Sequence, residues 1–246
     1  MRWIYLSPHL DDAALSAGGL IYEQTYSGIP VEIWTFMCGD PGPTEVSPFA
    51  QLQHTQWGFA NAAEAMRERR KEDLRAVDIL GAKAVHFDFL DCIYRRGRAG
   101  EWLYQEIFVP PHEEEADLPS EIASAITSRL QPDDVVVCQL SVGSHVDHVL
   151  VRQAAERLGL GQRLIYDIDM PYFLYKSHEL ERKAAGMRES VSRITEAGLE
   201  RWVAAVAAYK SQLPWLHESF NTPEKAWVTI RAYWEKWGGV RLLQKE

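Results

Sequence analysis

The chain carries Pro8-His9-Leu10-Asp11-Asp12 directly after a short apolar run, Trp3-Ile4-Tyr5-Leu6. It repeats this arrangement far downstream, where Ser144-His145-Val146-Asp147-His148 follows the apolar run from Val135 to Leu140. Each apolar run predicts a buried strand, and each polar cluster lies just beyond the end of its strand. Two such clusters indicate one site at one edge of a sheet.

Strand-like and helix-like segments alternate through the first two-thirds of the sequence. The expected strands are 2–7, 31–38, 84–90, 134–140 and 163–168. The expected helices are 12–27, 61–80, 119–131 and 147–158. This alternation predicts an α/β fold with a Rossmann-like, mostly parallel sheet and helices on both faces. Ligands bind to such sheets beyond the carboxyl ends of the strands, where both polar clusters are expected.

The last third is expected to be mainly helical. The expected elements there are helices over 177–188, 190–211 and 223–237 and a small terminal strand at Leu242-Leu243. The sequence shows no internal repeat, low-complexity tract or linker, so we expect a single α/β domain over residues 1–246. Two long connections are expected at 39–60 and 92–118. Loops of this length are usually functional or mobile.

Composition narrows the class of protein. Hydrophobic residues make up 46% of the chain, which suffices for a sizeable core and excludes disorder. The formal net charge of −9 gives no attraction to nucleic acid or anionic lipid. Three scattered cysteines (Cys38, Cys92 and Cys138) argue against a disulfide framework and for a reducing compartment. The first strand leaves no room for a signal peptide and no apolar run reaches membrane-spanning length, so we expect a cytoplasmic protein.

The two polar clusters have the composition of a metal site. His9 and Asp12 lie three positions apart in a turn that leads into a helix, so their side chains can converge on one point. His148, beyond the other strand, would supply a third ligand. Two histidines and one carboxylate hold Zn²⁺ and leave a position open for water, whose pKa then falls to roughly 7. The same ligands also suit Fe²⁺.

Asp11 and His145 remain as free functional groups beside the expected ion. A carboxylate next to the bound water suits a general base. An imidazole on the other side suits a protonated donor that stabilises the oxyanion and then protonates the leaving amine. Asp147 could orient one of the histidines by accepting its ring N–H.

Each of these residues alone has a simpler interpretation. Asp11 or Asp12 could cap the helix that follows, and a single histidine in a loop is usually structural. The motifs H-x-D-D and H-x-D-H occur together, each after a strand and at the expected binding edge. Their joint occurrence favours a metal site over these alternatives.

The motifs P-H-L-D-D-A-A-L and H-V-D-H resemble those of the PIG-L/LmbE-like family of zinc-dependent de-N-acetylases. Members of this family remove an acyl group, usually acetyl, from an amino sugar such as N-acetylglucosamine within a conjugate. The resemblance spans most of the chain in order. Weaker matches that support it are Arg69-Arg70-Lys71-Glu72, Leu80-Gly81, Phe89-Leu90-Asp91, the segment from Tyr166 to Tyr172, and Tyr209-Lys210-Ser211-Gln212.

The resemblance implies a role for each polar group of the two motifs. It makes His9, Asp12 and His148 the metal ligands, Asp11 the base, and His145 the electrostatic and acid partner. It also implies that Arg69 or Arg70, together with Asp91, holds substrate hydroxyls, and that Asp169 supports the ligands. The alternatives are surface salt bridges for the two arginines and a loop cap for Asp169.

The chain departs from the family pattern in a few places. Many members have proline at the positions of Leu10 and Val146, neither of which supplies a catalytic atom. The loops 39–60 and 92–118 match nothing in the family pattern and would form a substrate-specific wall. The side chains that suit such a wall are His54, Trp57, Phe59, Tyr94, Arg95, Arg96 and Trp102. The run Glu113-Glu114-Glu115 is expected to be a solvated charge patch.

Together these features predict a metal-dependent hydrolase that cleaves an N-acetyl or other N-acyl amide. Its expected partner is a small-molecule N-acylated amino sugar or a conjugate of one, with no nucleic acid and no membrane. The alternatives are an amidase acting on another small amide conjugate and a non-catalytic, sugar-binding member of the same fold. A nucleotide enzyme is disfavoured because no G-x-G-x-x-G follows the first strand.

The tryptophans of the last expected helix allow three interpretations. Trp227, Trp234 and Trp237 lie at roughly helical spacing. Their main interpretation is an apolar helix face packed on the core. The same face could form a sugar platform or pack against a second subunit, so a homo-oligomer is compatible with the sequence.

Overall fold

A seven-stranded sheet forms the centre of the computed structural model, which describes residues 1–42 and 45–245. Its strands are β1 (Trp3–Ser7), β2 (Val31–Met37), β3 (Lys83–Phe89), β4 (Val135–Gln139), β5 (Leu164–Asp167), β6 (Met187–Arg193) and β7 (Gly239–Lys245). Their order is β3-β2-β1-β4-β5-β7-β6. The first five strands pair in parallel and the last two pair antiparallel. The mostly parallel, Rossmann-like sheet is therefore confirmed.

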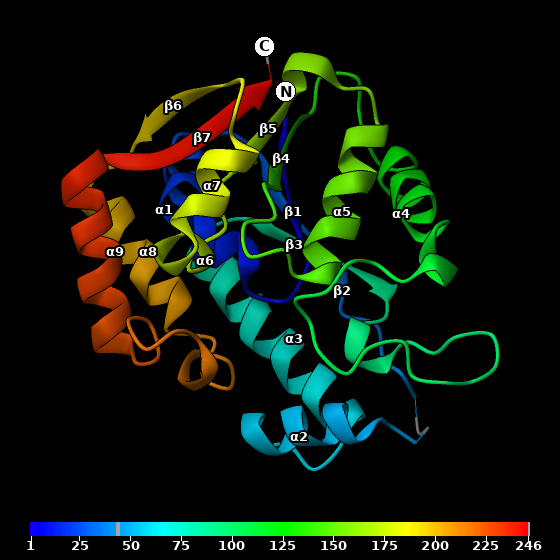
Figure 1. Ribbon diagram of the computed structural model, residues 1–246. Helices are drawn as coiled ribbons and strands as arrows, with labels where there is room; N and C mark the ends of the chain where they lie inside the picture. The colour runs from blue at the N-terminus through cyan, green and yellow to red at the C-terminus, as the bar shows by residue number, and fades with distance from the viewer. Residues whose placement is uncertain (43–44, 246) are drawn as a thin grey trace.

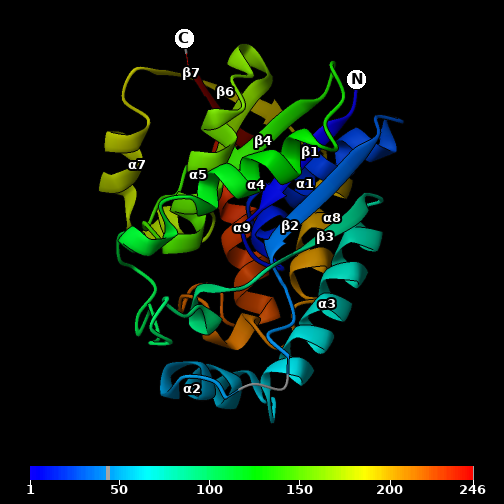
Figure 2. The same cartoon turned by 90° about the vertical axis from the view of Figure 1, so that its right-hand side faces the viewer.

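Helices cover the sheet on both sides, as Figures 1 and 2 show. One layer contains α1 (Asp12–Tyr26), α3 (Ala62–Ile79), α8 (Glu196–Val206) and α9 (Pro223–Trp237). The opposite layer contains α4 (Leu118–Thr127) and α5 (Val146–Arg157). The short helices are α2 (Pro48–Trp57), α6 (Tyr172–Tyr175), α7 (Ser177–Lys183) and the 3₁₀ turns η1 (Cys92–Tyr94), η2 (Glu113–Glu115), η3 (Gly161–Arg163) and η4 (Leu213–Trp215).

Two small residues allow α8 to pack closely against α1. A Cβ atom placed on Gly18 would lie 2.6 Å from Cδ1 of Trp202, and one on Gly19 would lie 2.6 Å from Cδ1 of Ile194. Trp202 is completely buried, and its indole N–H donates to the carbonyl of Leu15 at 3.0 Å. The glycines thus open the space that this large side chain fills.

The connection 39–60 contains a helix, α2, that is not among the elements expected from the sequence. Positions 43 and 44 of this connection lie outside the described residues. Helix α2 begins after Ser47, whose side chain accepts a hydrogen bond from the backbone N–H of Ala50 at 2.9 Å. Pro48 occupies the first helical position, and Gly58 ends the helix with φ of 80°. These are ordinary start and stop signals. The helix was missed because it carries no clear apolar stripe.

The expected helix 190–211 is wrong at its beginning, and so is the end of 177–188. Residues Met187–Arg193 form strand β6, and the helical part is limited to α8. Strand β6 pairs antiparallel with β7 along its whole length, and β7 is longer than the two leucines suggested. Across this pair, Arg241 makes two hydrogen bonds to the carboxylate of Glu189, at 2.6 and 2.9 Å. Most side chains of β6 are exposed, so no apolar alternation marks the strand.

The C-terminal tryptophans pack against the main core. Trp227, Trp234 and Trp237 are partly buried on α9, and the indole N–H of Trp234 donates to the carbonyl of Ile194 at 3.0 Å. The three cysteines of the chain are buried and free. Among the residues described, no helix is both long enough and apolar enough to cross a membrane.

Candidate active site

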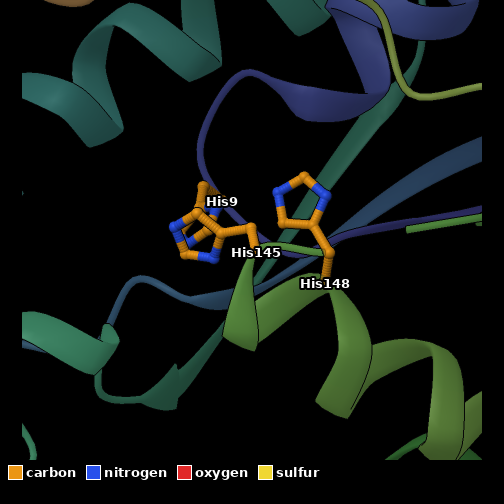
Figure 3. Close-up of side chains that lie close together, drawn as sticks. All are labelled: His9, His145 and His148. Atoms are coloured by element: carbon orange, nitrogen blue, oxygen red, sulfur yellow. The ribbon is translucent and has the colours of Figure 1, made fainter. Parts of the chain in front are cut away.

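The two polar clusters meet at the centre of the sheet. Strands β1 and β4 are neighbours, and the chain continues from β1 towards β2 on one side and from β4 towards β5 on the other. Such a switch point opens a crevice beyond the carboxyl ends of the strands. Figure 3 shows His9, from the loop before α1, beside His145 and His148 from the start of α5. The rings of His9 and His148 have centroids 5.3 Å apart.

Asp12 lies between His9 and His148. Its Oδ2 is 3.2 Å from Nδ1 of His9 and 3.4 Å from Nε2 of His148. Ligand atoms bonded to one tetrahedral zinc ion at 2.0–2.1 Å would lie about 3.3 to 3.4 Å apart. The separations around Asp12 therefore match two edges of such a tetrahedron.

Each of the two histidines has a carboxylate behind it. Nε2 of His9 lies 3.0 Å from Oδ2 of Asp147, and Nδ1 of His148 lies 3.2 Å from Oδ1 of Asp169. A carboxylate accepts a hydrogen bond, so these ring nitrogens donate and the opposite nitrogens keep their lone pairs. The free nitrogens are the two that face Asp12. Nε2 of His148 is buried and lacks a hydrogen-bond partner among the described residues.

Electrostatics favour positive charge between these groups. Burial alone would lower the pKa of His9, but hydrogen bonds to Asp12 and Asp147 outweigh burial and raise that pKa well above its usual value. Burial alone would raise the pKa of Asp12, but the neighbouring rings of His148 and His9 lower it below its usual range. A proton or a metal cation is therefore stabilised at this point.

His145 is held differently from the other two histidines. It precedes the first residue of α5, and its Nδ1 accepts a hydrogen bond from the backbone N–H of Asp147 at 3.1 Å. In the neutral ring the proton is then on Nε2, so this nitrogen is a donor and not a metal ligand. Burial and the nearby rings of His9 and His148 lower the pKa of His145 well below its usual value.

Asp11 does not cap the helix that follows it. It occupies the N-cap position of α1 without a side-chain hydrogen bond to the helix. The residue is 8% exposed and lines the cavity described below. Burial, followed by the nearby charge of Asp12, raises the pKa of Asp11 to about 7. A carboxylate of this kind can exchange protons near neutral pH.

The two candidate arginines have different environments. Arg69 is 4% exposed, lies over the ring of Trp57 at 4.7 Å and has a guanidinium nitrogen 3.8 Å from Oδ2 of Asp91. Arg70 instead donates to the carbonyl of Cys38 at 2.9 Å and to Asp88 at 3.1 Å. The structure thus brings Arg69 and Asp91 to the site. It places Arg70 outside the cavity, where it joins α3 to the ends of β2 and β3.

The sequence interpretation missed the arginine that supports Asp147. Arg95, expected in a substrate wall, is buried, and its guanidinium lies 2.6 Å from Oδ1 of Asp147 and 2.5 Å from Oε1 of Glu115. Tyr104 also donates to Glu115 at 2.6 Å. Glu115 is therefore not part of a solvated patch, in contrast to the exposed Glu113 of the same run. No sequence pattern marks this contact, because Arg95 and Glu115 lie twenty positions apart in one long loop.

A cavity of about 160 Å³ opens onto these groups. Its polar lining consists of His9, Asp11, Asp12, Gln53, Arg69, Asp91, His145 and Gln212. Its apolar and aromatic lining consists of Leu15, Trp57, Ile93, Ile107, Pro171, Tyr172, Trp215 and Leu216. The lining comes from both long connections and from the C-terminal third. Of the expected wall residues, Trp57 lines the cavity, whereas His54 donates to or accepts from the hydroxyl of Tyr94 at 2.7 Å beneath it.

Comparisons with known proteins agree with this arrangement. The family model described as PIG-L, GlcNAc-PI de-N-acetylase, matches residues 4–158. The zinc-inhibited form of teicoplanin deacetylase Orf2 is 31% identical, with a TM-score of 0.83 over 99% of this chain and 97% of that chain. The antimicrobial reagent A40926 pseudoaglycone deacetylase is 27% identical, with a TM-score of 0.72 over 98% of this chain and 95% of that chain.

A more distant structure shares the fold. N,N'-diacetylchitobiose deacetylase from Pyrococcus horikoshii is 20% identical, with a TM-score of 0.54 over 98% of this chain and 83% of that chain. A comparison with curated protein sequences gave no match.

Proposed function

Because the chain belongs to the PIG-L family of GlcNAc-PI de-N-acetylases, we propose that it is a zinc-dependent hydrolase that removes an N-acetyl group from an amino sugar within a small-molecule conjugate. The observation that carries the proposal is the position of Asp12 between two histidines whose lone pairs face it. The solved deacetylases similar to this chain support the reaction type and, by their names, a glycoconjugate substrate.

The residues present fit a divalent ion. We assign His9, Asp12 and His148 as its protein ligands, because their free donor atoms converge and Nε2 of His148 is otherwise an unpaired buried polar atom. Asp147 and Asp169 fix the two rings. When bound, Zn²⁺ or Fe²⁺ polarises an amide carbonyl and makes water more acidic.

Asp11 is proposed as the general base. Its carboxylate reaches the cavity, and the helix N-terminus behind it does not use it as a cap. It would take a proton from the water that attacks the amide carbon. The same carboxyl group could later return that proton to the departing amine.

His145 is proposed as the donor that stabilises the tetrahedral intermediate. Its Nδ1 is occupied by the backbone N–H of Asp147, so its Nε2–H is available as a donor. This role differs from the protonated donor expected from the sequence: a neutral imidazole fixed in this way stabilises negative charge on the former carbonyl oxygen without first gaining a proton, and Asp11 supplies the proton of the leaving amine. Arg69 and Asp91 would bind sugar hydroxyls, since they lie at the same cavity.

The test is a screen for primary-amine release from N-acetylated sugars and their conjugates, with and without a chelator. We expect release that the chelator abolishes and added zinc restores. Asp11→Asn should retain the ion and lose most turnover, whereas His9→Ala should lose both. Asp78→Asn, on the exposed face of α3, is the matched control for a lost carboxylate and should behave as wild type.

The outcomes separate the proposal from its alternatives. Release only from non-sugar amides would indicate an amidase for another conjugate. Sugar binding without release would indicate a non-catalytic member of the fold. Normal turnover by Asp11→Asn, or loss of its ion, would contradict the assigned role of Asp11.

A further inference from the structure

Three exposed aromatic side chains surround the mouth of the cavity. Phe108, Tyr175 and Trp215 are 45%, 39% and 52% exposed, among the most exposed large hydrophobic side chains of the described residues. Single exposed apolar residues are common on protein surfaces, but a cluster at a cavity indicates a contact site. Trp215 lines the cavity itself. Phe108 and Tyr175 both contact Tyr172, and Tyr172 lines the cavity.

The rings of Phe108, Tyr172 and Tyr175 contact one another in a series that starts at His145. Phe108 packs edge-to-face on His145 and on Tyr172, with centroids 6.0 and 5.9 Å apart. Tyr175 lies 6.1 Å from Tyr172 and stacks on His217 at 4.6 Å and 13°. We call Phe108, Tyr172, Tyr175 and Trp215 the aromatic rim. It extends outward from the groups proposed to act on the amide.

The charges around the cavity disfavour an anionic group at this surface. Arg69 is the one lysine or arginine among the described residues that line the cavity, and it faces Asp91 and the ring of Trp57. Lys176 lies over the ring of Phe108 at 5.0 Å, and its ammonium group is 3.7 Å from Glu179. A phosphate would find no uncommitted cation among these groups. Flat apolar groups, by contrast, gain from offset or edge-to-face packing on aromatic rings.

We propose that the aromatic rim is a binding subsite for an aryl aglycone. The substrate is then an N-acylated amino sugar joined to an aromatic group, with the amide inside the cavity and the aryl ring on the rim. This inference rests on the proposed function, since it assumes that the sugar amide is what enters the cavity. It separates this chain from enzymes that act on a phosphate-bearing conjugate.

The test compares glycosides that differ only in what the rim would contact. The substrates are 4-nitrophenyl N-acetyl-β-glucosaminide, its methyl analogue, N-acetylglucosamine 1-phosphate and methyl N-hexanoyl-β-glucosaminide. We expect kcat/KM to be highest for the aryl glycoside and lowest for the phosphate. Phe108→Ala and Trp215→Ala should each lower the ratio of kcat/KM for the aryl glycoside to kcat/KM for the methyl glycoside by about 2- to 12-fold.

Two further variants control the experiment. Phe108→Leu keeps apolar area without a ring and should behave like Phe108→Ala with the aryl glycoside. Val228→Ala removes apolar surface from the exposed face of α9, in a hollow that shares no residue with the cavity, and should match wild type with every substrate.

Several results would overturn the inference. They are equal kcat/KM for the aryl and methyl glycosides, full activity of Phe108→Leu, and a preference for the hexanoyl amide that the rim variants abolish. If no substrate is hydrolysed, the proposed function fails separately. Calorimetry with the aryl and methyl glycosides then still tests the rim, through a Kd ratio that Trp215→Ala should reduce.

Discussion

Oδ1 of Asp169 lies 3.2 Å from Nδ1 of His148, and both side chains are completely buried. The contact fixes the ring so that its other nitrogen faces Asp12 across 3.4 Å. A buried carboxylate in this position determines which nitrogen is free and also makes that nitrogen a better ligand. The proposed ion site therefore depends also on residues that would not themselves touch the ion.

Asp169→Asn tests this relationship. An amide can accept the same hydrogen bond but brings no negative charge, so we expect zinc affinity to fall by about 10- to 100-fold with the fold retained. Competition with a fluorescent chelator measures the affinity, and circular dichroism checks the fold. Asp78→Asn on exposed α3 controls for the loss of one charge. An affinity within twofold of wild type would contradict the assigned role of Asp169.

Arg95→Met tests the ion pairs behind His9. The change leaves Asp147 and Glu115 buried without their cation, so we expect the free energy of unfolding to fall by about 3–5 kcal/mol. Arg96→Met removes a neighbouring exposed arginine that lies over Trp102 and should cost about 0.5–1 kcal/mol. Urea denaturation measures both. Equal losses for the two variants would show that burial does not distinguish them.

Arg69→Met and Arg70→Met should separate substrate binding from stability. Arg69 lines the cavity, so its loss should raise KM roughly tenfold or more through lost hydrogen bonds to the sugar. Arg70 donates to a backbone carbonyl and to the exposed carboxylate of Asp88, so its loss should cost about 1 kcal/mol of stability and leave KM unchanged. Steady-state kinetics and urea denaturation decide. The reverse pattern would reassign the two residues.

Acid should weaken the cluster at the start of β1. Burial alone would raise the pKa values of Glu32 and Asp134. Glu32 accepts hydrogen bonds from Trp34 and Arg2, and Asp134 accepts them from Arg2. These hydrogen bonds outweigh burial and lower both pKa values. A lowered folded pKa gives stability that is present above the unfolded pKa and is lost as the pH falls through the folded one. We expect Arg2→Met to cost up to about 1 kcal/mol at pH 7 and less once both carboxyl groups are protonated. Urea titrations between pH 7 and 3 measure this gap, and a constant gap would argue against the assignment.

The sequence predicted the parallel part of the fold because buried strands and helices have distinct periods there. It could not predict β6, whose residues are mostly exposed and are extended because they pair with β7. The polar motifs predicted His9, Asp12 and His148 near one another because both follow neighbouring strands. Burial of Arg95 depends on where a long loop folds back, and no local pattern encodes that contact. Which of Arg69 and Arg70 faces the cavity depends on the orientation of α3, and the motif alone does not specify that orientation.

The central claim is that one ion is held by His9, Asp12 and His148. The most direct measurement is anomalous diffraction at the zinc edge from crystals of the zinc-loaded protein. We predict one strong peak about 2.0–2.2 Å from a nitrogen of each histidine and from an oxygen of Asp12. A peak bonded to other residues, or none between these three at saturating zinc, would contradict the account.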